Sequence, residues 1–200
     1  MSTGDRPTVL VVDDEPDVAD AYAAQLADRY DVETAYSGEE ALEMLSADTD
    51  VVLLDRRMPG ISGDDVLERI RDAGHDCRVA MVTAVDPDFD IIEMPFDDYV
   101  IKPVSRDDLF DTIERLLTCA AYEQKLQEFY RVSAKYATLV ATKSNSELET
   151  REEFEELRRE RERLREELDR TVERFDDADF AAVFRELHDA SRVTYEPPDE

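Results

Sequence analysis

Residues 51–63, VVLLDRRMPGISG, decide the fold of the first part of the chain. The four apolar residues at 51–54 predict a buried strand that ends on Asp55. A charged residue directly after such a strand lies at the carboxyl edge of a parallel sheet, where open α/β folds place their chemistry. The Met-Pro-Gly sequence at 58–60 then predicts a turn, and Ser62 or Gly63 begins the next helix.

The same pattern repeats on both sides of this stretch. Short apolar runs at 8–12, 32–35, 78–82 and 98–101 predict four more strands, and amphipathic stretches between them predict helices. A β-α unit repeated five times indicates an α/β fold: a five-stranded, parallel, doubly wound sheet covered by helices on both faces. The segment 86–97 breaks the pattern, because it holds two prolines and has room for barely two helical turns.

Polar side chains follow four of the predicted strands directly. Asp13 and Asp14 follow the first strand, Asp55 the third, Thr83 the fourth and Lys102 the fifth. Because the carboxyl ends of parallel strands share one edge of the sheet, we expect these five groups to converge.

Three convergent carboxylates raise one another's pKa values unless a cation neutralises them. An oxygen-only site of this kind suits Mg²⁺, and Asp55 on its turn is then a carboxylate nucleophile that forms an aspartyl phosphate. Lys102 supplies a point charge and Thr83 a hydroxyl hydrogen bond. Taken singly, each residue has a plainer interpretation as a helix cap, a strand-end residue or a solvated charge. Taken together, they favour phosphoryl transfer.

Four short motifs carry a family resemblance. VVDDEP, LLDRRMPG, MVTA and DDYVIKP make residues 1–118 similar to a response-regulator receiver domain of two-component signalling, which has a flavodoxin-like fold. The resemblance implies that Asp55 accepts a phosphoryl group from a sensor histidine kinase. It also implies that Asp14, Asp55 and the carbonyl of Arg57 bind Mg²⁺ directly, whereas Asp13 binds it through water.

The resemblance assigns two further features near the fifth strand. Thr83 and Tyr99 would form the switch, with Tyr99 moving inward when the threonine engages the phosphoryl group, and the Lys102-Pro103 peptide bond would be cis. Two departures stand out. The segment 86–97 is shorter than the fourth helix usual in the family, and Arg56, Arg57 and Val85 are bulky residues around the acceptor.

The composition is extremely acidic. The net charge is −28, from 28 Asp and 24 Glu against 20 Arg and 4 Lys. Such a surface repels nucleic acid and anionic lipid, and its self-repulsion is relieved by salt, so the balance resembles that of proteins from salt-accumulating halophiles. No apolar run suits a bilayer span and no leader precedes residue 8, which predicts a cytoplasmic protein without a membrane partner. Cys77 and Cys119 lack metal-ligand spacing and are interpreted as free thiols.

After residue 118 the pattern becomes helical. Apolar and aromatic residues from Tyr122 to Phe175 alternate spacings of four and three, which indicates a coiled-coil seam interrupted at 144–146. Ser144 with Glu147, or Ser146 with Glu149, would begin the second helix, and the short connection predicts an all-α antiparallel hairpin. A third helix is expected at 180–187, with residues 119–190 forming the domain and residues 191–200 a disordered tail. The region resembles the HalX domain of halophilic archaea.

Arg161 and Thr171 fall on the seam, which makes a lone hairpin marginal and favours a homodimer through these helices. The predicted function is therefore a phosphorylation-dependent response regulator with a helical dimerisation module. It is not an enzyme beyond self-catalysed transfer to and hydrolysis from Asp55. The alternative is a transcriptional regulator whose helical domain binds DNA, although the net charge disfavours DNA and glutamates interleave the arginine run at 158–165.

Overall fold

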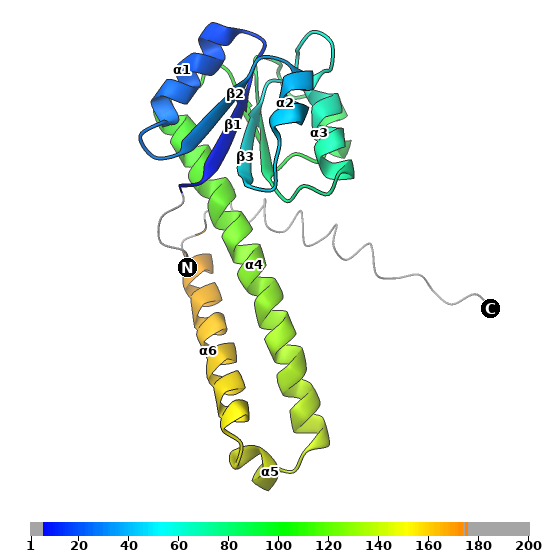
Figure 1. Ribbon diagram of the computed structural model, residues 1–200, viewed down its shortest axis with the longest axis vertical. Coiled ribbons are helices and arrows are strands. Elements are labelled where there is room, and N and C mark those ends of the chain that lie inside the picture. The colour runs from blue at the N-terminus through cyan, green and yellow to red at the C-terminus, as the bar shows by residue number, and fades with distance from the viewer. Residues whose placement is uncertain (1–5, 174, 176–200) are drawn as a thin grey trace, which may run out of the picture. The chain divides into compact units, whose positions relative to one another are not determined.

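Five parallel strands alternate with helices through the first part of the chain (Figure 1). The computed structural model describes residues 6–173 and 175. The strands are β1 (Thr8–Val12), β2 (Asp31–Ala35), β3 (Thr49–Leu54), β4 (Arg78–Thr83) and β5 (Asp98–Ile101), and the helices before β4 are α1 (Pro16–Leu26), α2 (Gly38–Met44) and α3 (Gly63–Asp72). They lie in the order β2-β1-β3-β4-β5, with every neighbouring pair parallel. The predicted α/β fold is confirmed.

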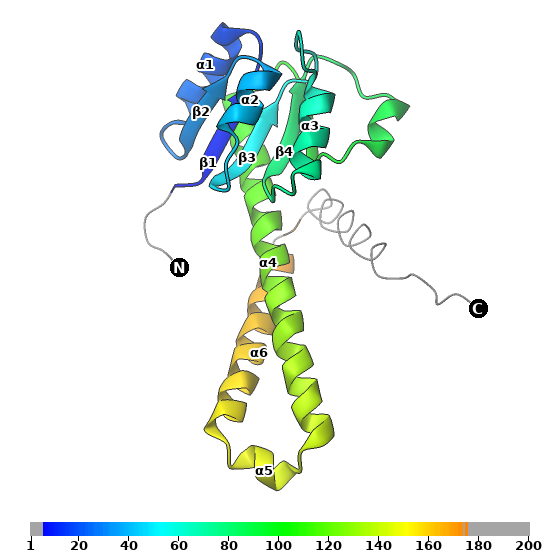
Figure 2. The same cartoon turned by 45° about the vertical axis from the view of Figure 1, so that its right-hand side comes forward.

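Each face of the sheet is covered by helices, as Figure 2 shows for α2 and α3. On one face, Val9, Val11 and Leu53 pack with residues of α1 and of the first turns of α4 (Arg106–Thr142). On the other face, Leu10 and Leu54 pack with α2 and α3. The strands are continuously apolar because both of their faces are buried.

Local capping fixes where the helices next to the strand ends begin. Pro16 occupies the first turn of α1, where its missing N–H costs nothing. Ser62 and Asp65 form a reciprocal capping box at the start of α3, with the Asp65 N–H donating to Ser62 Oγ (3.2 Å) and the Ser62 N–H to Asp65 Oδ2 (3.3 Å). Gly60, in the turn before α3, has a φ of +79°, which only glycine adopts without strain.

The segment between β4 and β5 forms only the short 3₁₀ helix η1 (Phe89–Glu93). Pro87 and Pro95 flank it, and a proline cannot donate the backbone hydrogen bond that would extend a helix through its position. The expected shortening of this segment is confirmed.

The chain divides into two compact units, Met1–Leu117 and Thr118–Glu200. α4 is a single uninterrupted helix across this boundary. In the second unit, α5 (Asn145–Glu149) follows Ser144, whose N–H donates to Glu147 Oε2 (3.0 Å). Of the two capping boxes left open by the sequence, the Ser144–Glu147 pair is the one that forms.

α6 (Glu152–Val172) runs alongside the C-terminal part of α4 (Figures 1 and 2). Tyr136 stacks on Phe154 at a ring-centroid distance of 5.3 Å, and Lys125 pairs with Glu167 at 3.0 Å. Earlier residues of α4 meet later residues of α6, which makes the pair antiparallel. The predicted helical hairpin is confirmed.

The two polar residues on the seam of the hairpin, Arg161 and Thr171, both have partners. The Arg161 guanidinium lies 4.6 Å from the centroid of the Tyr136 ring, a cation–π contact, and the Thr171 hydroxyl donates to the carbonyl of Glu167 (3.0 Å). Arg161 therefore has a partner across the hairpin, and Thr171 has one within its own helix.

The third helix expected at 180–187 and the tail at 191–200 lie outside the described residues. Across residues 6–173 and 175, no helix combines the length and the apolar character needed to cross a bilayer.

Candidate functional site

Lys102, Asp13 and Asp55 meet at the carboxyl edge of the sheet. Lys102 Nζ, after β5, donates to Asp13 Oδ2, after β1, at 2.6 Å and to Asp55 Oδ1, after β3, at 2.8 Å. Both carboxylates are almost fully buried, with side chains 4% and 9% exposed, and the lysine side chain is 16% exposed. Three strand ends that are distant in sequence thus form one charged cluster, because parallel strands bring their carboxyl ends together.

Backbone groups orient both carboxylates. The Arg57 N–H donates to Asp55 Oδ2 (2.8 Å), and the Glu15 N–H donates to Asp13 Oδ1 (3.0 Å). The loop that carries Asp55 closes tightly on the start of α3, since a Cβ added at Gly63 would lie 2.1 Å from the Asp55 carbonyl oxygen. Glycine at 63 is therefore required to hold Asp55 in this position.

The charge balance of the cluster is incomplete. Burial raises the pKa of Asp55 above its ordinary 3.8, although the hydrogen bond and charge of Lys102 oppose the rise. Burial alone would lower the pKa of Lys102, but its hydrogen bonds to Asp13 and Asp55 outweigh that effect and raise the pKa. One ammonium thus serves two buried carboxylates, and the site favours additional positive charge.

The oxygen donors here suit a hard divalent cation. Asp13 and Asp55 are close enough to share one cation, as their common contact with Lys102 shows, and Mg²⁺ commonly uses one or two carboxylates while keeping several waters. Asp14 is only half-buried. Within the described part of the chain, no group of three acidic, His or Cys side chains is arranged to hold an ion by itself, so the Mg²⁺ site, which also uses the Arg57 carbonyl and water, stays a prediction. Asp13 extends the β1 ladder, because its N–H donates to the Ala35 carbonyl (3.1 Å).

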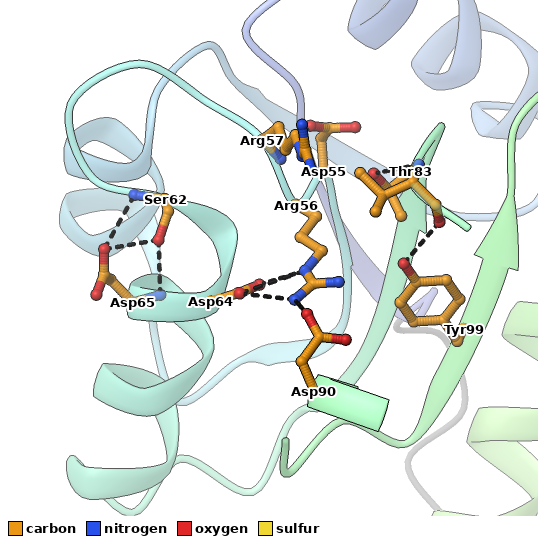
Figure 3. A network of polar contacts seen from close by, with 10 residues as sticks. Asp55, Arg56, Arg57, Ser62, Asp64, Asp65, Thr83, Asp90 and Tyr99 are labelled. Atoms are coloured by element: carbon orange, nitrogen blue, oxygen red, sulfur yellow. Dashed lines mark hydrogen bonds and ion pairs between the residues drawn. The ribbon is translucent and has the colours of Figure 1, made fainter. Parts of the chain in front are cut away.

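Thr83 and Tyr99 bond to the same residue, Val85 (Figure 3). The Val85 N–H donates to the Thr83 hydroxyl at 3.3 Å, and the Tyr99 hydroxyl donates to the Val85 carbonyl at 2.8 Å. Tyr99 is half-buried and packs on Phe96 with ring centroids 5.5 Å apart. The two predicted switch residues are therefore linked through one residue, Val85. The Lys102-Pro103 bond is cis, as expected.

Arg56 lies beside the acceptor in sequence, but its side chain points to other partners. The guanidinium donates to Asp64, with Nε 3.0 Å from Oδ1, and pairs with Asp90 (Figure 3). The hydrogen bond from Arg56 lowers the pKa of Asp90. Sequence reasoning missed Asp64 and Asp90, because no motif or spacing marks either residue as a partner of Arg56.

Comparison with known proteins gives two family matches. Residues 9–114 match the response regulator receiver domain, and residues 118–184 match the HalX domain. A Haloferax volcanii protein named as a candidate transcriptional regulator is 54% identical over 132 residues, which cover 66% of this chain and 23% of that protein. The transcriptional regulatory protein DltR of Streptococcus agalactiae is 39% identical over 110 residues, covering 52% of this chain and 49% of DltR.

A solved structure agrees with the fold. The beryllofluoride-activated receiver domain of DrrB, a Thermotoga maritima protein, is 27% identical with a TM-score of 0.52, and the match covers 56% of this chain and 97% of that domain. The chain spans about a quarter of the length of the Haloferax protein and about half of the length of DltR.

Proposed function

The chain belongs to the response regulator receiver family, as a two-component response regulator with a HalX domain after the receiver, and we propose that it is a phosphorylation switch with Asp55 as the acceptor. The observation that carries the proposal is the buried Asp55 carboxylate, held by Lys102 and by the Arg57 N–H at the carboxyl edge of the sheet. A fixed carboxylate with a neighbouring cation is the arrangement that phosphoryl transfer requires.

In the proposed reaction a carboxylate oxygen of Asp55 attacks the phosphorus of a phosphohistidine on a sensor kinase. The new P–O bond forms as the P–N bond breaks, and the imidazole leaves with the bonding electron pair. Lys102 neutralises charge beside the acceptor. The Thr83 hydroxyl would donate to a phosphoryl oxygen. Mg²⁺ would be held by Asp14, Asp55 and the Arg57 carbonyl, with Asp13 acting through water, and would neutralise the phosphoryl oxygens.

The same proposal extends to the domains and their partners. Residues 1–118 form the receiver, and residues 119–190 form a HalX-like interaction module through which two copies pair. The kinase is the phosphodonor in the cytoplasm, and water later hydrolyses the acyl phosphate within the same site. No turnover of an outside phosphoester is expected.

The direct test is labelling by acetyl phosphate. The wild-type chain with Mg²⁺ is expected to gain one phosphoryl group by intact-mass measurement, and EDTA should lower the yield. Asp55→Asn should abolish labelling, whereas the control Asp48→Asn, an exposed carboxylate near the start of β3, should label normally. Equal labelling of wild type and Asp55→Asn would reject Asp55 as the acceptor.

A second candidate, DNA binding by the helical module, is favoured only by the names of the relatives. The arginines of α6 are largely engaged with acids: Arg158 with Glu155 (2.8 Å), Arg163 with Glu167 (3.2 Å) and Arg170 with Glu166 (3.1 Å). A gel-shift titration at the working salt separates the two functions. Salt-dependent retardation would support DNA binding, and its absence would remove this candidate.

A further inference from the structure

Residues 86–93 are held to the rest of the receiver very sparsely. None of their side chains is buried, and Phe89 and Ile92 are 86% and 74% exposed. Within the described residues, the pair between Asp90 and Arg56 is the one side-chain hydrogen bond or ion pair that joins them to another element. The following residues are anchored differently, since Arg71 Nε donates to the Pro95 carbonyl (3.0 Å) and Asp97 accepts from Arg71, Arg78 and the Val79 N–H.

Arg56 is a rigid anchor for this contact. Its side chain is only 10% exposed, and Asp64 at the start of α3 holds its guanidinium through two nitrogens, at 3.0 Å and 3.1 Å. The hydrogen bonds that Arg56 donates to Asp64 and Asp90 raise the pKa of Arg56 well above its usual range, so the side chain stays charged. The residue before it in the chain is the acceptor, Asp55.

The charges around Arg56 explain why its ion pair with Asp90 is important for holding residues 86–93. A hollow of about 550 Å³ lies between the acceptor loop and the 86–93 segment, and it is lined by Asp64, Asp86, Asp88 and Asp90 together with Arg56 and Arg57. Carboxylates on both sides of the hollow repel each other, and the Arg56 guanidinium bridges the two sides (Figure 3). If the ion pair between Arg56 and Asp90 weakened, residues 86–93 would face acidic neighbours without an ion pair to hold them.

We propose that Arg56 is a positioning residue whose ion pair with Asp90 transmits the state of Asp55 to residues 86–93. This inference rests on the proposed function, because it deepens the regulation of the same site. In the free protein the Arg56 guanidinium points toward Asp64 and Asp90. In this proposal a phosphoryl group on Asp55 adds negative charge one residue from Arg56 and draws the guanidinium away from Asp90. The pair weakens, the segment loosens, and the exposed Phe89 and Ile92 change their surroundings. Tyr99 contributes to the raised pKa of Arg56 and donates its hydroxyl to the Val85 carbonyl, so in this proposal the same change reaches the switch residues.

Hydrogen exchange measured by mass spectrometry on the full chain tests this inference. In wild type, the peptide containing residues 86–94 should exchange faster once beryllofluoride and Mg²⁺ are added. Asp90→Asn should exchange several-fold faster than wild type already in the free protein, with little further change on adding beryllofluoride. The control Asp86→Asn removes the same charge from the same segment but lacks a contact with Arg56, and it should behave as wild type.

The affinity for beryllofluoride is a second readout, because coupling between two sites acts equally in both directions. A merely structural role of Asp90 would leave this affinity unchanged. If loosening the segment and loading the acceptor are coupled, Asp90→Asn should bind beryllofluoride about fivefold more tightly than wild type, at the low end of typical couplings. Asp86→Asn should leave the affinity unchanged.

The outcomes separate the two proposals. If wild type takes up neither acetyl phosphate nor beryllofluoride, the proposed function fails. If wild type is labelled normally and Asp90→Asn matches it in both exchange and affinity, the role of Arg56 and Asp90 is overturned while the function stands. If the peptide containing residues 86–94 exchanges equally fast in wild type and in Asp90→Asn without beryllofluoride, the inference is overturned whatever the affinities are.

Discussion

Two buried carboxylates share one ammonium at the carboxyl edge of the sheet. Asp13 and Asp55 each place one oxygen on Lys102 and the other on a backbone N–H. Breaking a buried ion pair by removing one partner leaves charge without compensation, which costs more than the pair contributes when it is intact. The reactivity of Asp55 and the stability of the receiver therefore depend on the same lysine.

Lys102→Met should lower the free energy of unfolding by about 3 kcal/mol at neutral pH in the absence of Mg²⁺, because it leaves two buried carboxylates without a counter-charge. Urea denaturation followed by circular dichroism measures the effect. Lys135→Met removes an equal charge from an exposed position and serves as the control. Equal stability of Lys102→Met and wild type would contradict the account.

The loss of unfolding free energy caused by Lys102→Met should depend on pH. The folded-state pKa of Asp55 is already raised by burial, and loss of Lys102 raises it further. A carboxyl whose pKa is higher in the folded than in the unfolded state stabilises the fold at low pH, and this contribution is lost as the pH rises through the folded pKa. The difference in unfolding free energy between Lys102→Met and wild type should therefore increase from acid toward neutral pH. A gap that is constant or narrows over that range would contradict the charge explanation.

At the scale of the element, the helix starts fix where the functional side chains lie. The capping box of Ser62 and Asp65 begins α3, and the same turn brings Gly63 against the Asp55 carbonyl and Asp64 against Arg56. One local motif therefore supports both the acceptor loop and the anchor of the 86–93 segment.

Ser62→Ala should lower the free energy of unfolding by about 1 kcal/mol, because it removes the hydroxyl that accepts the Asp65 N–H. It should also speed amide exchange at the first turn of α3. Urea denaturation and hydrogen exchange measure the two effects, and unchanged values in both would show that the cap does not fix this turn.

The elements were predictable because their signals are local. Apolar runs, prolines and capping residues mark each strand and helix over a few positions, and the strand ends then place Asp13, Asp55 and Lys102 together. The partners of Arg56 were not predictable, because they lie 8 and 34 residues away and no periodicity selects them. The contact of Arg161 with the Tyr136 ring was not predictable for a similar reason, since it depends on how the two helices face each other.

At the scale of the whole molecule, the net charge of −28 opposes every compact state. The Debye length shortens from about 10 Å at 0.1 M salt to about 3 Å at 1 M. The melting temperature should accordingly rise as KCl is increased over this range, as measured by circular dichroism. A melting temperature that is constant or falls would show that self-repulsion does not limit the stability of this chain.

The proposed homodimer is also a property of the whole chain. Tyr130 and Val140 on α4 are 61% and 47% exposed, which leaves apolar surface on the helical module. Sedimentation velocity at the working salt should detect a dimer, and Tyr130→Glu together with Val140→Glu should shift it toward monomer. A wild-type chain that stays monomeric at high micromolar concentration would reject pairing through these helices.

The identity of the phosphorylated atom tests the central claim most directly. Borohydride reduces an acyl phosphate to an alcohol, so a phosphorylated aspartate becomes homoserine and can be located by peptide mass spectrometry. After treatment with acetyl phosphate and Mg²⁺, homoserine is expected at position 55 and at no other aspartate. Homoserine at another aspartate, with position 55 unchanged, would contradict the account.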